Sequence, residues 1–500
     1  MPDLEKQAEN HALFLPTGNG VHKKRSALRK TLPQILATLA FGMLIFSVST
    51  ICVMPTIVIG ALHKKDEFGN ILESEIPFTD QQASWFGSVV YIAQPLGSLT
   101  SGFIQDHLGR KRCMMAVTIP QFIGWIILYF AQSIEQLFTA AVIMGLSVGF
   151  MEAPAMSYLG EVCEPRLRGT LSSFSEVFLL LGILFKFFIG AMLTWRNSCA
   201  VALTVPVLAF ILLSIVPESP TWYLLNNRNT EAEKSLRWLR GWLKSEEIQH
   251  EFIALTSSIN QGYVQVNTTE KNEHNVVAIK PKRNSEWAQM KLLNQGRVYR
   301  PIILTMVYFF IGHCISLIGL RTFLVSIFKG FNTSLSPYSV LVLAGLLQTI
   351  GSVFCAILIH KLGKRVLMIA STIGGVLSCF LLAIYIILKI DVPWVPVLLF
   401  CVNFFCGGLG SMTLPWVLVC EIFPLDAKGF SAGLVAASSY VFMSIISKTY
   451  VDMASVINLE GALIVYGIIG IFGFVFLYFR QPETEGKTLA EIEEFFQDKS

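Results

Sequence analysis

Long apolar stretches separated by short polar connections run through most of the chain. A helix needs about 20 apolar residues to cross the hydrocarbon core of a bilayer. Gly and Pro occur inside several of these stretches, which membrane helices tolerate because neighbouring helices satisfy the freed backbone groups. The pattern predicts an all-α membrane protein with twelve transmembrane helices, at residues 33–61, 83–104, 113–132, 136–159, 171–193, 197–216, 301–327, 337–359, 366–388, 393–418, 430–451 and 459–479.

The polar connections between these stretches occur in the same order twice. Basic residues are concentrated at 102–112 in the first half of the chain and at 360–365 in the second. Each is followed by a segment in which six residues separate an acid from a base, Glu161–Arg168 and Glu421–Lys428. A two-fold internal repeat is typical of transporters that rock one half against the other. We therefore predict two pseudo-symmetric six-helix halves.

A long polar segment is predicted to divide the halves. It opens with Pro217-Glu-Ser-Pro220, and Leu and Trp recur within it at helical spacing among charged residues, so short amphipathic helices are expected there. The predicted parts are an N-terminal tail at 1–31, a first half at 32–216, a linker at 217–299, a second half at 300–479 and a C-terminal tail at 480–500.

The composition agrees with a membrane protein, and the distribution of charge predicts its orientation. Hydrophobic residues make up 53% of the chain and charged residues 14%, whereas about 25% of residues are charged in soluble domains. Lys and Arg gather in the N-terminal tail, the linker and the even-numbered connections, while the loop at 62–80 is acidic. Because cytoplasmic loops are enriched in Lys and Arg, both termini and the linker are predicted to be cytoplasmic.

The sequence contains no pattern typical of an enzyme. The ten cysteines lie in or beside the apolar stretches without metal-ligand spacing, and no P-loop or nucleophile elbow occurs. We expect no metal, no cofactor, no nucleic-acid partner, and no enzymatic or ATP-driven activity. Asn332-Thr-Ser334 is an acceptor motif for N-glycosylation in a predicted outer loop, which makes Asn332 a candidate glycosylation site.

Acids and bases that lie together at the ends of predicted helices are candidates for a cytoplasmic gate. Ion pairs among them could close the gate and release it when the halves rotate. Alternatively, the bases could only follow the preference of Lys and Arg for the cytoplasm. The presence of acids in both halves favours gating. The candidate gating residues are Asp106, Arg110, Lys111, Glu161, Arg168, Lys364, Arg365, Glu421 and Lys428.

Several motifs resemble those of the sugar porter family of the major facilitator superfamily. In chain order they include Ser84-Trp-Phe-Gly-Ser88, Tyr158-Leu-Gly-Glu161, Pro217-Glu-Ser-Pro220, Glu421-Ile-Phe-Pro424 and Pro482-Glu-Thr-Glu-Gly-Lys487. The first of these is similar to insect facilitated trehalose transporter-like members. The resemblance implies a twelve-helix fold, a central sugar site, alternating access, a plasma-membrane location and a monomer that is sufficient for transport.

The residues expected to line the central site depart from the sugar porter pattern. The resemblance places Gly312 and His313 where the family carries a Gln pair, and Glu176 where it carries a Gln in the fifth span. His313 could bind sugar hydroxyls or carry a proton, or it could only pack against a neighbouring helix. The candidate substrate-binding residues are Gln348, Trp416, Ser439, Tyr440, His313 and Glu176.

Charged residues inside predicted spans are costly to bury and suggest function. Glu152 and Glu176 are candidates for a proton site. Three bases lie nearer the predicted outer ends, namely Lys186, Arg321 and Lys448. They could extend to the membrane interface or join an ion-pair network inside the protein. The first span has no acid at the position that the resemblance associates with proton coupling, which favours facilitated diffusion.

The sequence leaves three functions open. The leading one is facilitated diffusion of trehalose or a hexose by alternating access. The alternative within transport is a proton-coupled or non-sugar solute carrier with an altered central site. A sensor that does not transport is less favoured, because both predicted tails are short. The expected partners are a small-molecule solute and the lipid bilayer.

Overall fold

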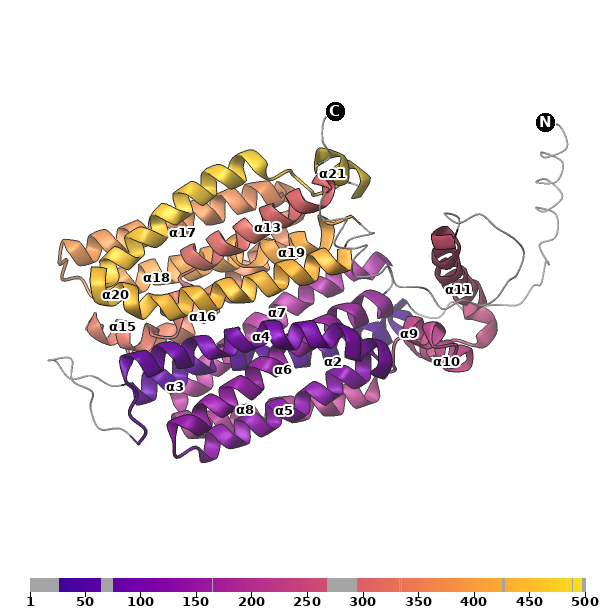
Figure 1. The fold of residues 1–500 in the computed structure, drawn as a ribbon, viewed down its shortest axis with the longest axis horizontal. Coiled ribbons are helices and arrows are strands. Elements are labelled where there is room, and N and C mark those ends of the chain that lie inside the picture. Colours follow the sequence, from indigo (N-terminus) through magenta and orange to yellow (C-terminus); the bar gives the residue numbers. More distant parts are fainter. Residues whose placement is uncertain are drawn as a thin grey trace.

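The computed structural model describes residues 27–63, 75–163, 165–267, 295–331, 333, 335–424, 428–487 and 489–496. Within these ranges the regular secondary structure is entirely helical, as the apolar pattern predicts. Ten of the described helices are long and apolar enough to cross a membrane. Figure 1 shows long helices running side by side, with several short helices beyond one end of the bundle.

Polar caps start several helices of the first half. The Thr79 hydroxyl accepts a hydrogen bond from the Gln82 backbone N–H at 3.2 Å, and the Gln82 side chain accepts one from the Thr79 N–H at 3.0 Å. This capping box satisfies two N–H groups that the helix itself leaves free. The helices of this half are α2 (Ala27–Cys52), α3 (Met54–Leu62), α4 (Asp80–Leu108), α5 (Arg110–Phe130), α6 (Ile134–Val162), α7 (Pro165–Met192) and α8 (Trp195–Ile215).

Three short helices separate this half from the second, namely α9 (Pro220–Leu225), α10 (Asn229–Leu239) and α11 (Ser245–Asn267). The second half contains α13 (Gly296–Ile315), α14 (Ile318–Arg321), α15 (Leu324–Gly330), α16 (Pro337–Leu362), α17 (Lys364–Ile387), α18 (Trp394–Cys406), the π-helix η1 (Gly407–Ser411), α19 (Thr413–Glu421), α20 (Lys428–Arg480) and the terminal α21 (Leu489–Phe496).

Three spans that the apolar pattern predicts as single helices are interrupted. The span at 33–61 breaks at Val53 between α2 and α3. The span at 301–327 breaks at Leu317, which adopts a left-handed conformation with φ 55°, and again after α14. The span at 393–418 contains the glycine-rich η1. Hydropathy did not reveal these breaks because a change of backbone conformation leaves the apolar content unchanged.

The number of spans stays a prediction. The helix α20 covers the predicted spans at 430–451 and 459–479, and Asn458, with φ 59° and ψ −177°, divides it at a kink. The helix α4 covers 83–104 but is not among the ten, since it carries more polar residues than the others. Dividing α20 at its kink and including α4 would reach the predicted twelve.

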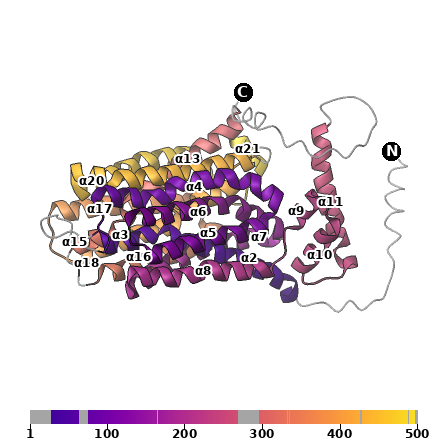
Figure 2. The same ribbon diagram turned by 60° about the horizontal axis from the view of Figure 1, so that its bottom comes forward.

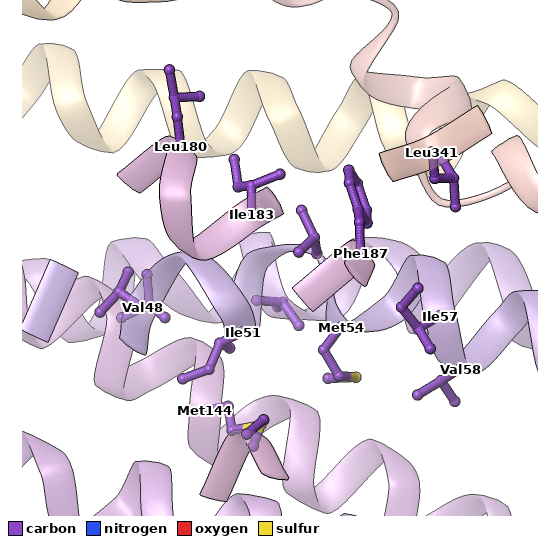
Figure 3. Close-up of a cluster of buried hydrophobic side chains, with 14 of the residues drawn as sticks. Val48, Ile51, Met54, Ile57, Val58, Met144, Leu180, Ile183, Phe187 and Leu341 are labelled. Carbon is purple, nitrogen blue, oxygen red and sulfur yellow. The ribbon is translucent and has the colours of Figure 1, made fainter. Parts of the chain in front are cut away.

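The two halves meet along two pairs of helices. The helix α4 of the first half packs against α20 of the second, and α7 packs against α16. A large apolar cluster continues from one half into the other across this boundary. Figure 3 shows Ile57, Phe187 and Leu341, from α3, α7 and α16, in this cluster. The halves therefore share one core on this side of the boundary.

Matched glycines support the pseudo-symmetry of the halves. A Cβ atom at Gly149 would collide with the backbone carbonyl of Gln94 on the adjacent α4. A Cβ atom at Gly408 would collide with the backbone carbonyl of Gln348 on the adjacent α16 in the same way. Small residues let membrane helices approach closely, and here the same close approach occurs once in each half.

The two ends of the bundle differ in what lies beyond them. We use "linker end" for the end at which α9, α10, α11 and α21 lie, and "loop end" for the opposite end, with α3, α15 and the kink of α20 (Figures 1 and 2). The basic connections at 108–112 and 362–365 lie at the linker end, because they join helices that run from the loop end and back.

Candidate transport pathway and gates

At the linker end of the first half, Arg110 joins two acids. Its guanidinium lies 3.5 Å from the Asp106 carboxylate and 3.2 Å from the Glu161 carboxylate. Arg110 is buried, so these contacts offset a desolvation cost that an exposed pair would not carry. The structure thus brings together three of the candidate gating residues, from the end of α4, the start of α5 and the end of α6.

A further acid, Glu218, completes this cluster. Its carboxylate accepts hydrogen bonds from the backbone N–H groups of Lys111 at 2.9 Å and Arg112 at 3.4 Å, at the N-terminus of α5. An anion is favoured there because the first N–H groups of a helix are free and carry partial positive charge. The hydroxyl of Ser219 donates to Glu161. The start of the linker is thereby fastened to the first half.

The second half repeats this arrangement at the start of α17. The Glu483 carboxylate accepts hydrogen bonds from the backbone N–H groups of Lys364 and Arg365, both at 3.0 Å. The Lys364 ammonium lies 2.5 Å from Glu421 and 2.9 Å from Glu485. Lys364 is therefore buried between two carboxylates, and the cluster has the same order of helix start, base and acid as in the first half.

Electrostatics favours the ionised form of the two acids in the C-terminal segment. Burial opposes ionisation of Glu483, but the backbone N–H groups that point at it together lower its pKa below the usual value. Burial likewise opposes ionisation of Glu485, and the Lys364 ammonium and the His360 ring outweigh it and lower its pKa. Both carboxylates are thus anions that hold the start of α17.

The sequence reasoning missed Glu218 and Glu483 as members of these clusters. The available signal was the repetition of Pro-Glu followed by Ser or Thr at 217–219 and 482–484, once after each half. The Lys111 ammonium donates to the Ser214 carbonyl at 2.9 Å, and Arg365 donates to the Tyr478 carbonyl at 2.7 Å, rather than to an acid.

Two candidate gating side chains fall outside what the structure describes. Arg168 lies on α7 and Lys428 on α20, but their side chains are not among the described ones. Their pairing with Glu161 and Glu421 therefore stays a prediction. The candidate glycosylation site Asn332 also lies outside the described residues.

At the loop end, polar contacts join the two halves directly. The Gln81 amide donates to the Asp452 carboxylate at 2.9 Å, and the Ser84 hydroxyl donates to the Lys448 carbonyl at 2.8 Å. The Thr56 hydroxyl of α3 donates to the Arg321 carbonyl of α14 at 3.1 Å. These contacts connect α4 with α20 and α3 with α14, so the halves are closed against each other at this end.

Between the two ends, His313 and Ser439 meet in the second half. The His313 Nε2 atom lies 2.8 Å from the Ser439 hydroxyl, and both residues are buried. The ring of Phe309 packs edge-on against Trp416 with centroids 4.8 Å apart, and Tyr440 lies 6.3 Å from Trp416. The structure therefore groups four of the six candidate substrate-binding residues, which a sequence register alone could place only one by one.

The two buried acids of the first half interact with different helices. Glu152 on α6 interacts with the side chains of Tyr440 on α20 and Ser98 on α4, while its Oε2 atom has no hydrogen-bond partner among the described residues. Glu176 on α7 lies near Cys355 on α16. Each acid thus faces the boundary between the halves, but towards a different part of it.

Gln348 is also buried at this level of the bundle. It lies on α16, and its Oε1 atom has no hydrogen-bond donor among the described residues. A buried amide oxygen without a partner is costly, so its position suggests that it can serve a solute.

The three bases predicted near the outer ends behave differently from one another. Lys448 forms an ion pair with Asp452 at 3.2 Å and lies over the Trp85 ring. Lys186 is fully buried and donates to the Ser198 carbonyl at 3.2 Å. Arg321 is only 7% exposed and lies over the Phe404 ring. Extension to the interface is therefore wrong for Lys186 and Arg321, because the surrounding helices enclose both side chains.

Possible metal ligands do not cluster in the part of the chain that the structure describes. No group of three or more His, Cys, Asp or Glu side chains is arranged to hold a metal ion among these residues. The described cysteines are all free thiols, and all but Cys52 are buried. The chemistry available at the centre is thus hydrogen bonding, ring contact and charge.

Curated relatives match most of this chain. A facilitated trehalose transporter, Tret1, from Culex quinquefasciatus is 26% identical over 99% of this chain and 90% of its own. The Tret1 of Bombyx mori is 28% identical over 84% of this chain and 80% of its own. The Tret1 of Anopheles gambiae is 26% identical over 92% of this chain, which covers 55% of that relative.

Solved structures and a family model agree with the fold. The xylose transporter XylE from E. coli, in a partially occluded inward-open conformation, matches with a TM-score of 0.70 at 17% identity, over 92% of this chain and 99% of its own. Residues 30–496 match the family described as "Sugar (and other) transporter". The repeated helix-start clusters, the two interlocked halves and this match show that the chain is a membrane transporter, not an enzyme, and belongs to the sugar transporter family.

Proposed function

We propose that the protein carries a sugar, trehalose or a hexose, across the plasma membrane by facilitated diffusion with alternating access. The observation that carries this proposal is the match of residues 30–496 to the sugar transporter family. It is supported by relatives named facilitated trehalose transporters along most of the chain. The termini and the linker are assigned to the cytoplasm, and a monomer suffices for transport.

The geometry supports a two-state mechanism. In the present state the halves are joined at the loop end by Gln81, Ser84 and Thr56. At the linker end, the Arg110 and Lys364 clusters each bind acids of their own half. Rocking the halves would break the loop-end contacts and expose the central polar residues to the other side.

The central residues suit a hydroxylated solute. Gln348, His313 and Ser439 offer donors and acceptors, and Trp416 and Tyr440 offer ring faces on which a sugar can pack. Facilitated diffusion is favoured over coupling because the first turn and body of α2 carry no acid at 46–49. Glu152 favours the alternative, a proton-coupled carrier, because its carboxylate meets Tyr440 across the boundary between the halves.

Uptake into proteoliposomes tests both candidates. We expect saturable uptake of labelled trehalose or glucose, unchanged by an imposed proton gradient. Ser439→Ala should weaken uptake, because it removes the partner of His313, whereas Ser438→Ala, at the neighbouring position, should not. Uptake that accumulates solute with the proton gradient, and loses this in Glu152→Gln, would favour the coupled carrier. The absence of saturable flux for any sugar would refute the proposed function.

A further inference from the structure

An arginine lies unpaired at the centre of the transport pathway. Arg321 belongs to α14, the short helix between the two breaks in the seventh predicted span. Substrate sites of transporters are commonly formed by such discontinuous helices. The Arg321 side chain is 7% exposed, and its guanidinium lies 4.8 Å from the centre of the Phe404 ring. It also lies close enough to Tyr91, across the boundary between the halves, to interact with it electrostatically.

The charge of Arg321 is not balanced within the protein. No ion pair joins it to an acid among the described residues, and its Nε and Nη2 atoms have no hydrogen-bond acceptor there. Glu152 and Glu176 interact with other side chains, as described above. Burying an unpaired charge costs several kcal/mol. A transporter can accommodate that cost if the partner arrives with the solute.

The two unpaired atoms specify the shape of that partner. The N–H groups of Nε and Nη2 project in parallel from one edge of the planar guanidinium group. This edge matches the two oxygens of a carboxylate, which accept both hydrogen bonds at once. An ammonium group could not replace this fork. Nearby polar atoms without partners, Nδ1 of His313 and Oγ1 of Thr322, remain for hydroxyl groups on the same solute.

We propose that Arg321 binds a carboxylate, so that the transported solute is a sugar acid, a small polyhydroxylated molecule with one carboxylate group. This inference rests on the proposed function, because it uses the same pathway and the same alternation of access. It narrows the class of solute from neutral sugars to acidic ones. Phe404 supplies the apolar wall behind the guanidinium, and Tyr91 closes the site from the first half.

The full-length protein in proteoliposomes provides the transport test, with labelled gluconate and glucose as probes. Gluconate uptake should saturate, and an inside-positive potential should increase it because the solute carries negative charge. Arg321→Gln should reduce gluconate uptake roughly tenfold or more, since it removes a charged bidentate contact. Arg321→Lys should rescue it poorly, because it keeps the charge and loses the fork. Arg480→Gln, an exposed base at the linker end of α20, is the matched control.

Thermal unfolding of the detergent-solubilised protein keeps the test decisive if a variant folds poorly. Gluconate should raise the melting temperature of the wild-type protein more than glucose or chloride does, and this excess should vanish in Arg321→Gln. Stabilisation by chloride alone, or equal loss of glucose and gluconate uptake in Arg321→Gln, overturns the inference. Saturable glucose flux without gluconate flux overturns it and leaves the proposed function intact. No flux with gluconate-specific stabilisation refutes the proposed function and supports the binding site.

Discussion

At the scale of single residues, the acids that follow each half have a clear physical task. Glu218 and Glu483 each accept hydrogen bonds from the first two N–H groups of a helix, α5 and α17 respectively. Hydrogen bonds to a charged acceptor are worth about 1.5–3 kcal/mol. The linker and the C-terminal segment are thus tied to the bundle by a carboxylate rather than by apolar packing alone.

Lowering the pH should weaken the cluster in the second half. The pKa values of Glu483 and Glu485 are lowered in the folded protein from 4.5. Their contribution to stability is therefore complete above that value and is lost as the pH falls through the lowered folded values. The melting temperature of the solubilised protein should drop below about pH 4.5.

Glu483→Gln provides the comparison for this prediction. It should lower the melting temperature at neutral pH and make the acid-induced drop smaller, because one of the titrating groups is gone. An unchanged drop in Glu483→Gln would show that other carboxylates control the acid response.

At the scale of elements, backbone conformation decides where the helices begin. Gly363 has φ 82° and ends α16, and a Cβ atom there would collide with the Glu483 carboxylate. Gly109 has φ 99° and stands in the same relation to Glu218 in the first half. A side chain at either position would meet both backbone strain and a steric conflict with the anion that holds the next helix.

Gly363→Ala should therefore destabilise the protein, by about 1–3 kcal/mol from strain of this kind. The melting temperature of the solubilised protein measures the effect. Gly102→Ala is the matched control, because Gly102 lies within α4 and a Cβ atom there meets nothing within 4 Å. It should be neutral or stabilising, since Ala favours helix over Gly by up to about 1 kcal/mol. Equal destabilisation by both changes would contradict the role assigned to Gly363.

At the scale of the whole molecule, the two halves are held closed at the loop end by a small polar set. Lys448 contacts Asp452 at 3.2 Å and Gln81 at 3.3 Å, and lies 5.1 Å from the centre of the Trp85 ring. Lys448 and Asp452 belong to α20, while Gln81 and Trp85 belong to α4. The lysine thus connects the halves on the seam that must open during alternating access.

Lys448→Gln should shift the population away from this closed state. Partly exposed ion pairs contribute about 0.2–1 kcal/mol, so the shift should be modest, up to about fivefold. Hydrogen–deuterium exchange at the start of α4 should accelerate. Lys361→Gln, an exposed base on α16 at the linker end, should leave that exchange unchanged. Unaltered exchange in Lys448→Gln would place the closure in the apolar contacts instead.

The sequence by itself determined the fold class, the two-fold repeat and the acids and bases at the linker end. These follow from sums and spacings along the chain, because hydropathy and charge are properties of each residue. Only the tertiary structure decided the breaks at Val53 and Leu317, the contact of His313 with Ser439 and the burial of Arg321. These depend on which faces of distant helices meet, and a contact between residues 126 positions apart leaves no trace in either segment alone.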